Sequence, residues 1–260
     1  PHVVCLQGAW IFEYLPLDIS WDFKALLLDA LGGNYKEVVT HGGLLDIDLR
    51  ESLGVRIKDQ DVIIAKKNVG IVGIPDTITF DDQLTLITAI GPVTVLRGLS
   101  IAKLNIRGAE YTIGNTHLEA FDEFQPGVRL NQANQVVEEL EDETWPIILA
   151  GDFNAEPGWP AYDAIAAEFD DAWPPRLIGR RDPGFTFGRT DLISDDAVFD
   201  ERIDFVFTRN HRAVTLVGLT VGKSEFSKTD PVPYPPGSSS LIRLWPSDHL
   251  GLFFNLILPQ

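Results

Sequence analysis

The sequence contains no methionine and a single cysteine, Cys5, among its 260 residues. One cysteine excludes an internal disulfide framework and a cysteine-based zinc cluster. Basic residues are scarce, with 21 Lys and Arg against 38 Asp and Glu, which gives a formal net charge of −17. Because binding to a phosphate backbone depends mainly on Lys and Arg, this balance disfavours tight binding of duplex nucleic acid. It does not exclude an enzyme that meets phosphates through metal ions.

Long apolar runs are also absent. No uncharged apolar stretch approaches the roughly 20 residues that a membrane-spanning helix needs, so we expect no transmembrane segment. The hydrophobic content of 45% and charged content of 23% are those of a packed globule. We find no internal repeat, and only residues 223–240 form a stretch rich in proline and serine. That stretch is either a tolerated insertion or a flap beside a site, and we predict one domain over residues 1–260.

The N-terminal end indicates a missing segment. The chain opens at Pro1 without an initiator methionine and enters a strand-like apolar run at Val3. We therefore expect a further segment upstream of Pro1, and any signal peptide would lie there. The cellular compartment and the oligomeric state are not readable from the sequence.

Strand-like runs outnumber helix-like ones. The β-rich runs are 62–65, 84–88, 111–115, 147–150, 203–208, 214–221 and 252–258. Helices are predicted from Asp22, as the capping residue, to Leu31, over 128–140, and over 160–169 with Pro160 in the first turn. This combination predicts an α/β domain with β-rich core layers and flanking helices.

Polar residues stand at the ends of apolar strands in four places. The segments are Asn115–Glu119, Gly151–Asn154, Arg202–Phe205 and Ser247–His249. Burying an ionised carboxylate without a partner costs several kcal/mol, so such carboxylates are best explained if they share a cation or a histidine. Asp and Asn oxygens suit Mg²⁺ or Mn²⁺ better than Zn²⁺. A metal, a carboxylate base and imidazoles together suit water attack on a phosphoester.

In order and spacing, these segments and Leu6-Gln7 resemble the motifs of the endonuclease/exonuclease/phosphatase superfamily. This superfamily contains pancreatic-type deoxyribonucleases, abasic-site endonucleases, neutral sphingomyelinases and inositol-polyphosphate phosphatases. The resemblance covers nearly the whole chain. It implies a four-layer α/β sandwich with two central, mostly antiparallel sheets and a site at one end of the sandwich.

The resemblance also implies catalytic roles for individual residues. Asp152 would orient or deprotonate the attacking water, and Asn154 would help to position that water and the phosphate. His117 would donate a hydrogen bond to a phosphate oxygen. His249 would contact the scissile phosphate as acid, base or transition-state stabiliser, and Asp204 would accept from its ring and fix its tautomer.

The implied cofactor is Mg²⁺ or Mn²⁺, held by Asp152, Asn154 and Asp248. Two departures from the family pattern weaken this expectation. The family has a glutamate that binds the metal directly after the glutamine of its Leu-Gln-Glu motif, and here that position is Gly8. The family's N-terminal strand, which ends in an asparagine near the metal, would precede Pro1. We find no match for the glutamate that partners the first histidine in deoxyribonucleases.

The sequence thus predicts a divalent-metal-dependent phosphoesterase, and more specifically a phosphodiesterase. A small phosphodiester, a phospholipid head group and an oligonucleotide all remain open as substrates. Two alternatives also remain: a catalytically weakened binding module, suggested by Gly8, and a hydrolase of a non-phosphate ester. The segment Pro183–Phe187 resembles a family loop near the pocket, where an aromatic ring either stacks on substrate or only packs. We expect the other three histidines, His2, His41 and His211, at the surface.

Overall fold

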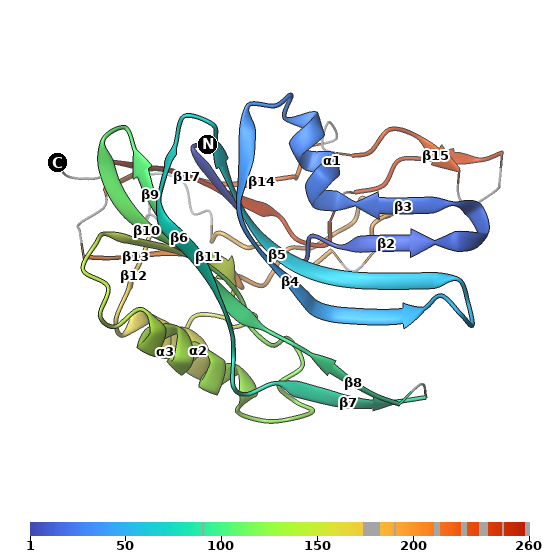
Figure 1. Ribbon diagram of the computed structural model, residues 1–260, viewed down its shortest axis with the longest axis horizontal. Coiled ribbons are helices and arrows are strands. Elements are labelled where there is room, and N and C mark those ends of the chain that lie inside the picture. Colours follow the sequence, from blue (N-terminus) through green and yellow to red (C-terminus); the bar gives the residue numbers. More distant parts are fainter. Residues whose placement is uncertain are drawn as a thin grey trace.

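Two stacked β-sheets form the centre of the molecule (Figure 1). The computed structural model describes residues 1–89, 91–173, 183–189, 191–210, 214–224, 228–233, 239–245 and 247–257. Its helices are α1 (Phe23–Ala30), α2 (Val128–Glu139), α3 (Pro160–Ala166) and the short 3₁₀ turn η1 (Leu15–Leu17). Of the helices in these residues, none has the length and apolar character needed to cross a membrane.

The first sheet is antiparallel and has five strands. They are β1 (Val3–Leu6), β2 (Ile11–Tyr14), β3 (Ile19–Asp22), β4 (Tyr35–Leu49) and β5 (Val55–Lys66). Their order is β1-β5-β2-β3, and β4 also pairs with β5. β5 is the central strand of this sheet. It pairs with β1 and β2 at successive parts of one edge and with β4 along the other edge.

The second sheet has six strands in the order β12-β13-β11-β10-β9-β6. They are β6 (Gly70–Thr79), β9 (Gly98–Ile106), β10 (Ala109–His117), β11 (Ile147–Asp152), β12 (Asp170–Asp171) and β13 (Asp204–Arg209). β10 and β11 are parallel, and the other pairs in this sheet are antiparallel. The described residues also form three two-stranded ladders: β7 (Leu84–Thr88) with β8 (Gly91–Val95), β14 (Val214–Val221) with β17 (Gly251–Ile257), and β15 (Val232–Pro233) with β16 (Leu241–Ile242).

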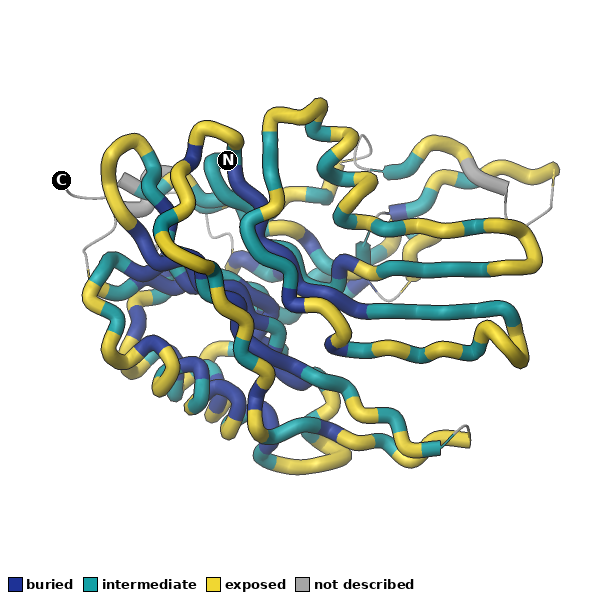
Figure 2. The backbone as a smooth tube through the Cα atoms, viewed as in Figure 1, coloured by how far each residue is buried: buried dark blue, intermediate teal, exposed yellow. Residues whose placement is uncertain are grey.

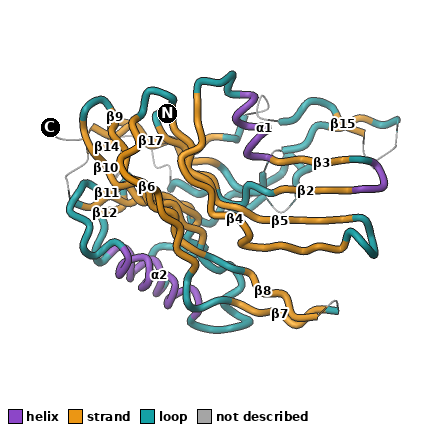
Figure 3. The backbone as a smooth tube through the Cα atoms, in the orientation of Figure 1, coloured by secondary structure: helices purple, strands orange, loops and turns teal. Residues whose placement is uncertain are grey.

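The side chains of β5 alternate between two layers, as the period of two in a strand requires. Val62 and Ile64 face outward and pack with leucines of α1. Ile63 and Ala65 face inward and pack against β9 and β10 of the second sheet. The far side of the second sheet is covered by α2 and α3 (Figure 1), and Figure 3 shows α2 beside the strands of this sheet. The arrangement is the predicted four-layer α/β sandwich, and Figure 2 shows the buried backbone concentrated where the two sheets cross.

The predicted helices are confirmed, with small differences at their ends. The Asp22 carboxylate accepts a hydrogen bond from the Ala25 amide at 3.1 Å and caps α1, a contact worth about 1 kcal/mol. α2 buries Val128, Ala133 and Val136 on one face. α3 begins at Pro160 but ends at Ala166, short of the predicted Phe169.

The predicted strands are also present, and those of the core are longer than the apolar runs alone indicated. The run at 252–258 corresponds to β17, with residue 258 outside the described residues. The proline-rich stretch 223–240 is described only in part and contains β15. None of its described residues lines the cleft considered below.

Candidate functional site

Three neighbouring strands bring three site residues to one end of the second sheet. In the ladder register, His117 of β10 lies opposite Asp152 of β11, and Asp152 lies opposite Asp204 of β13. These strand ends open into a cleft of about 1610 Å³. Every residue predicted for the site lines this cleft: His117, Asp152, Asn154, Asp204, Asp248 and His249.

The segment Gly151–Asn154 has a local geometry that needs its particular residues. A Cβ on Gly151 would stand 2.2 Å from the Thr116 carbonyl oxygen, so only glycine permits this approach of β11 to β10. Phe153 is fully buried in the core. Asn154 has a left-handed φ of 46°, a conformation that asparagine tolerates better than most residues. Its amide group donates to the Leu118 carbonyl at 2.9 Å, which fixes the side chain at the cleft.

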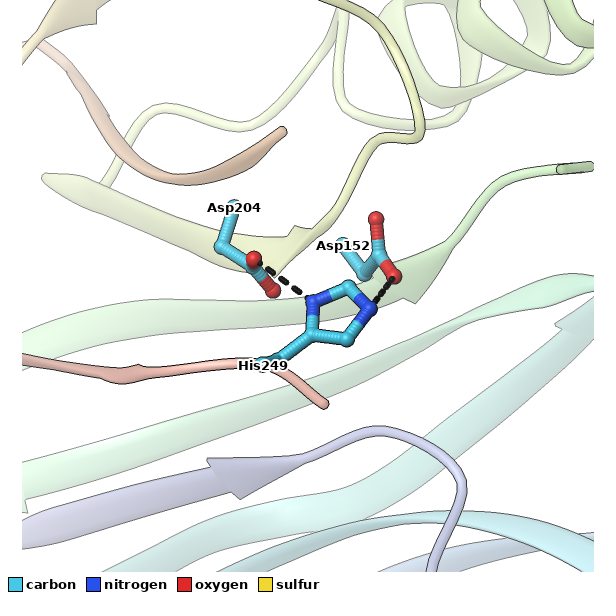
Figure 4. A group of neighbouring side chains, drawn as sticks. All are labelled: Asp152, Asp204 and His249. Atoms are coloured by element: carbon cyan, nitrogen blue, oxygen red, sulfur yellow. Dashed lines mark hydrogen bonds and ion pairs between the residues drawn. The ribbon is translucent and has the colours of Figure 1, made fainter. Parts of the chain in front are cut away.

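His249 lies between two carboxylates (Figure 4). Its Nδ1 is 3.0 Å from Asp204 Oδ2, and its Nε2 is 3.8 Å from Asp152 Oδ2. The ring packs against Phe187, with centroids 4.8 Å apart. Since an ionised carboxylate only accepts, Nδ1 carries the proton that Asp204 binds. The imidazole is therefore held with Nε2 directed at Asp152 and the cleft.

Burial and neighbouring charges shift the pKa values of this group. Burial raises the pKa of Asp152 to about 7, with a further contribution from the charge of Asp204. Burial alone would lower the pKa of His249, but the hydrogen bond and charge of Asp204 outweigh it and raise the value to about 9. Between these values the site holds a carboxylate base beside a protonated imidazole, the pairing that general acid–base catalysis uses.

The pH dependence of turnover tests this coupling. We expect activity to rise as Asp152 loses its proton near pH 7 and to fall as His249 loses its proton near pH 9. Asp204→Asn removes a charge that raises both pKa values, so both limbs should move to lower pH, the alkaline limb by about one unit or more. The measurement is kcat/KM against pH at constant metal concentration. An alkaline limb unchanged in Asp204→Asn would contradict the assignment.

Arg97 orients His117 through a hydrogen bond to its ring. The sequence analysis did not identify Arg97 as a site residue. Its Nη1 donates to His117 Nδ1 at 2.9 Å. Because a guanidinium has no acceptor, Nδ1 of His117 must accept and the ring proton must lie on Nε2. Burial and the Arg97 charge lower the pKa of His117 well below its usual value. His117 is thus a neutral imidazole that offers an N–H donor, with Nε2 3.6 Å from Asp152 Oδ2.

Two acids of β5, Asp59 and Asp61, lie close to Arg97 and His117. The sequence analysis did not predict them as site residues. Asp61 Oδ1 is 3.9 Å from His117 Nδ1, and Asp59 Oδ2 is 3.9 Å from Arg97 Nη1. Burial raises the pKa of Asp59, and burial together with the Asp59 charge raises that of Asp61 to about 8. The available signal was the position of Asp59-Gln60-Asp61 directly before the apolar run at Val62, although in the structure both acids lie within β5 and not at its end.

The donor set fits a hard cation. One ligand atom from each of Asp152, Asp204 and His249 lies within 4.8 Å of the others, a spacing that one metal ion can span. Asp248 stands apart from this group, exposed at the rim of the cleft, and accepts a hydrogen bond from Ser247 at 3.4 Å. Asp59 and Asp61 each have a buried oxygen without a hydrogen-bond partner among the described residues. Oxygen donors of this kind suit Mg²⁺ or Mn²⁺.

The remaining predicted positions are Gly8, the segment Pro183–Phe187 and the other three histidines. Gly8 lines the cleft and has a left-handed φ of 63°. In the segment Pro183–Phe187, Phe187 lines the cleft and its ring packs on that of His249. The predicted packing role is therefore present, and a contact with substrate stays a prediction. The surface prediction for His41 was wrong: it is 6% exposed, since Gly98 of β9 has no side chain and leaves room for its ring. His2 is half-buried, and His211 lies outside the described residues.

Comparisons with known proteins give one family match and several solved structures of similar fold. The sequence model of the Endonuclease/Exonuclease/phosphatase family matches residues 1–249. No curated protein matches the chain. A mannosyl-6-phosphatase structure from Bacteroides thetaiotaomicron is similar at 17% identity and TM-score 0.62, covering 98% of this chain and 85% of that one.

Two further solved structures share the fold. The human Nocturnin catalytic domain, with bound sulfate, is similar at 18% identity and TM-score 0.60, covering 100% of this chain and 82% of that one. TDP2 from D. rerio, complexed with a single-strand DNA product, is similar at 19% identity and TM-score 0.58. The match covers 99% of this chain and 86% of that one. At these identities the structures establish a common fold.

Proposed function

The chain belongs to the endonuclease/exonuclease/phosphatase family, and on that premise we propose that it is a divalent-metal-dependent phosphodiesterase that hydrolyses its substrate by water attack at phosphorus. Family members are hydrolases that act on phosphoesters. The observation that carries the proposal is the convergence of Asp152, His117 and His249, from three separate strands or strand ends, on one cleft. No single segment of the chain contains this set.

Each residue has a role that its contacts support. Asp152, with a pKa raised by burial to about 7, accepts the proton of the attacking water. His117, neutral and protonated on Nε2, donates to a non-bridging phosphate oxygen. His249, held by Asp204, donates to the phosphate or the leaving oxygen. The side-chain NH₂ of Asn154 donates to the Leu118 carbonyl and its backbone N–H donates to Asp152 Oδ1 at 2.9 Å. Its side-chain oxygen is the group that helps to position the water and the phosphate.

The cofactor proposed is Mg²⁺ or Mn²⁺, with Asp152, Asn154 and Asp248 as candidate ligands. When bound, such an ion neutralises charge that develops on the phosphoryl oxygens. The residues of the chain supply the remaining functions: Asp204 fixes the His249 ring, and Arg97 fixes the proton on Nε2 of His117.

The net charge and the aromatic side chains at the rim of the cleft bear on the substrate class. The net charge of −17 disfavours tight duplex binding. The rim of the cleft carries half-exposed aromatic side chains, among them Trp10, Phe121 and Trp159. The structural neighbours include a phosphatase of a sugar phosphate and a protein bound to a single-strand DNA product. A small phosphodiester, a phospholipid head group or an oligonucleotide would fit this setting.

A panel of three ester classes tests the proposal. We expect turnover of bis-p-nitrophenyl phosphate in Mg²⁺ or Mn²⁺, abolished by a chelator and restored by added metal. p-Nitrophenyl phosphate should turn over more slowly, and p-nitrophenyl acetate should show no enzyme-dependent rate. Chelator-insensitive hydrolysis of the acetate would contradict the proposal in favour of a carboxyl-ester hydrolase.

A binding module is the second candidate, and Gly8 is the observation that favours it, because it places no ligand atom in the cleft. The same panel separates the two functions. Absence of turnover with every metal and every ester, together with binding of a phosphodiester, would replace the enzyme with the binding module.

A further inference from the structure

Asp204 and His249 form a hydrogen bond although they come from parts of the chain that no β-ladder joins among the described residues (Figure 4). β13, which begins at Asp204, pairs with β11 and β12, whereas β17, which follows His249, pairs with β14. The side chains still meet, with His249 Nδ1 3.0 Å from Asp204 Oδ2. Another part of the structure must therefore set the distance between these two backbones.

Thr186 and Phe187 lie between the two backbones. The backbone N–H of Thr186 donates to the Glu201 carbonyl at 2.8 Å, and the Thr186 carbonyl accepts from the Leu250 N–H at 2.7 Å. Phe187 forms isolated β-bridges with both Glu201 and His249, and its ring packs on the imidazole. These two residues thus connect the chain just before β13 to the chain just before β17.

The side chain of Thr186 adds a direct contact to Asp204. Its Oγ1 accepts hydrogen bonds from the backbone N–H groups of Asp204, at 3.2 Å, and of Ile203, at 3.4 Å. A hydroxyl oxygen has two lone pairs, so these two bonds use its full capacity as an acceptor. Thr186 is 0% exposed, and a β-branched side chain has few rotamers. The oxygen is therefore fixed in place, and it fixes the backbone of Asp204.

We propose that Thr186 is a positioning residue for the His249–Asp204 pair. Its hydroxyl holds the backbone of Asp204, and its carbonyl holds Leu250, the residue after His249. The hydrogen bond of the pair needs both backbones at the right separation, and this bond directs the imidazole at Asp152 and the cleft. The role rests on the proposed function, because Thr186 affects the reaction only through these two groups.

Substitution of the hydroxyl tests the role. Thr186→Val keeps the branched shape of the side chain but cannot accept a hydrogen bond. We expect it to lower kcat for bis-p-nitrophenyl phosphate by at least about tenfold, because a small displacement of a catalytic group is costly. KM should stay within about threefold of the wild type. Thr186→Ser keeps the acceptor and should keep kcat within about threefold. An equal loss of kcat in both variants would overturn the proposal.

Thr208→Val is the matched control, because Thr208 is 3% exposed and lies on the same strand as Asp204. It should keep kcat within about threefold of the wild type. A loss as large as that of Thr186→Val would overturn the proposal, because the loss would then follow from any such change in the buried part of β13. Circular dichroism checks the fold of each variant.

A double-mutant cycle with Asp204→Asn separates positioning from a general loss of structure. If Thr186 acts through Asp204, Thr186→Val should lower kcat by less than about threefold further in the Asp204→Asn protein. Full multiplication of the two single losses in the double variant would overturn the proposal.

Proton nuclear magnetic resonance gives a readout that needs no substrate. The Nδ1 proton of His249 that Asp204 binds should give a resonance far downfield of the amide protons, and His249→Gln assigns it by its loss. The resonance should persist in Thr186→Ser and be shifted or lost in Thr186→Val. An unchanged resonance in Thr186→Val would overturn the proposal.

The two proposals fail in different ways. The expected resonance pattern in a wild-type protein that hydrolyses no phosphoester would reject the proposed function and keep the role of Thr186 in fixing the pair. Normal metal-dependent turnover and an unchanged resonance in Thr186→Val would do the reverse. If Thr186→Val does not fold, Thr186→Ala, which also lacks the hydroxyl, carries the same measurements.

Discussion

Asp152→Asn is expected to lower kcat for bis-p-nitrophenyl phosphate by about a thousandfold or more, within the range that a general base contributes. Among the described residues, Asp152 is the one carboxylate within 4 Å of both His117 and His249, with its Oδ2 3.6 Å from His117 Nε2 and 3.8 Å from His249 Nε2. In the wild type, the backbone N–H of Asn154 donates to Asp152 Oδ1 at 2.9 Å. An asparagine at position 152 can still accept this hydrogen bond, but it cannot take a proton from water. The loss should therefore appear in kcat, with the fold unchanged.

Asp142→Asn is the control for this prediction, since Asp142 is an exposed acid beyond the end of α2. It should retain wild-type kcat and KM. The melting temperature of Asp152→Asn should equal or exceed that of the wild type, because a buried charge near Asp204 has been removed. A loss of less than about tenfold in a folded Asp152→Asn protein would show that another group is the base.

Phe153→Ala is expected to have the largest effect on stability, about 3–5 kcal/mol of unfolding free energy, as for other fully buried aromatic residues. Phe153 is 0% exposed and packs edge-on against Phe205 and Phe207, with centroids 5.8 Å and 5.1 Å away. The ring anchors the turn that carries Asp152 and Asn154, so the substitution should also loosen the site. Urea denaturation at constant pH gives the free energy.

Phe124→Ala is the matched control, because the Phe124 side chain is 66% exposed. It should change the free energy of unfolding by less than about 0.5 kcal/mol. Equal effects of the two substitutions would mean that Phe153 is not a core anchor.

Much of the fold follows from local patterns in the sequence. Asp22 and the glycines after Leu31 mark the ends of α1 because a capping carboxylate and a helix stop are short-range effects. The apolar run at 147–150 predicts a strand covered on both faces, and β11 is such a strand. β4 escaped prediction because bulges between Glu37 and Val39, and between Gly42 and Leu45, break its period of two.

The residues singled out by chemistry and by sequence motif lie together in the structure, and their roles remain predictions. His117, Asp152, Asn154, Asp204 and His249 line one cleft together, and Asp248 stands at its rim. Arg97, Asp59 and Asp61 were not predicted, because their roles depend on β5 and β9 of different sheets approaching the end of β10. That approach is a property of sheet stacking, which no short segment of sequence specifies.

The most direct test of the central claim is hydrolysis of bis-p-nitrophenyl phosphate by the wild-type chain in ¹⁸O-labelled water with Mg²⁺ or Mn²⁺. If the cleft activates water against phosphorus, the p-nitrophenyl phosphate product gains one ¹⁸O atom, the p-nitrophenol gains none, and a chelator stops the reaction. Label in the p-nitrophenol, or turnover that persists in chelator, would contradict the account.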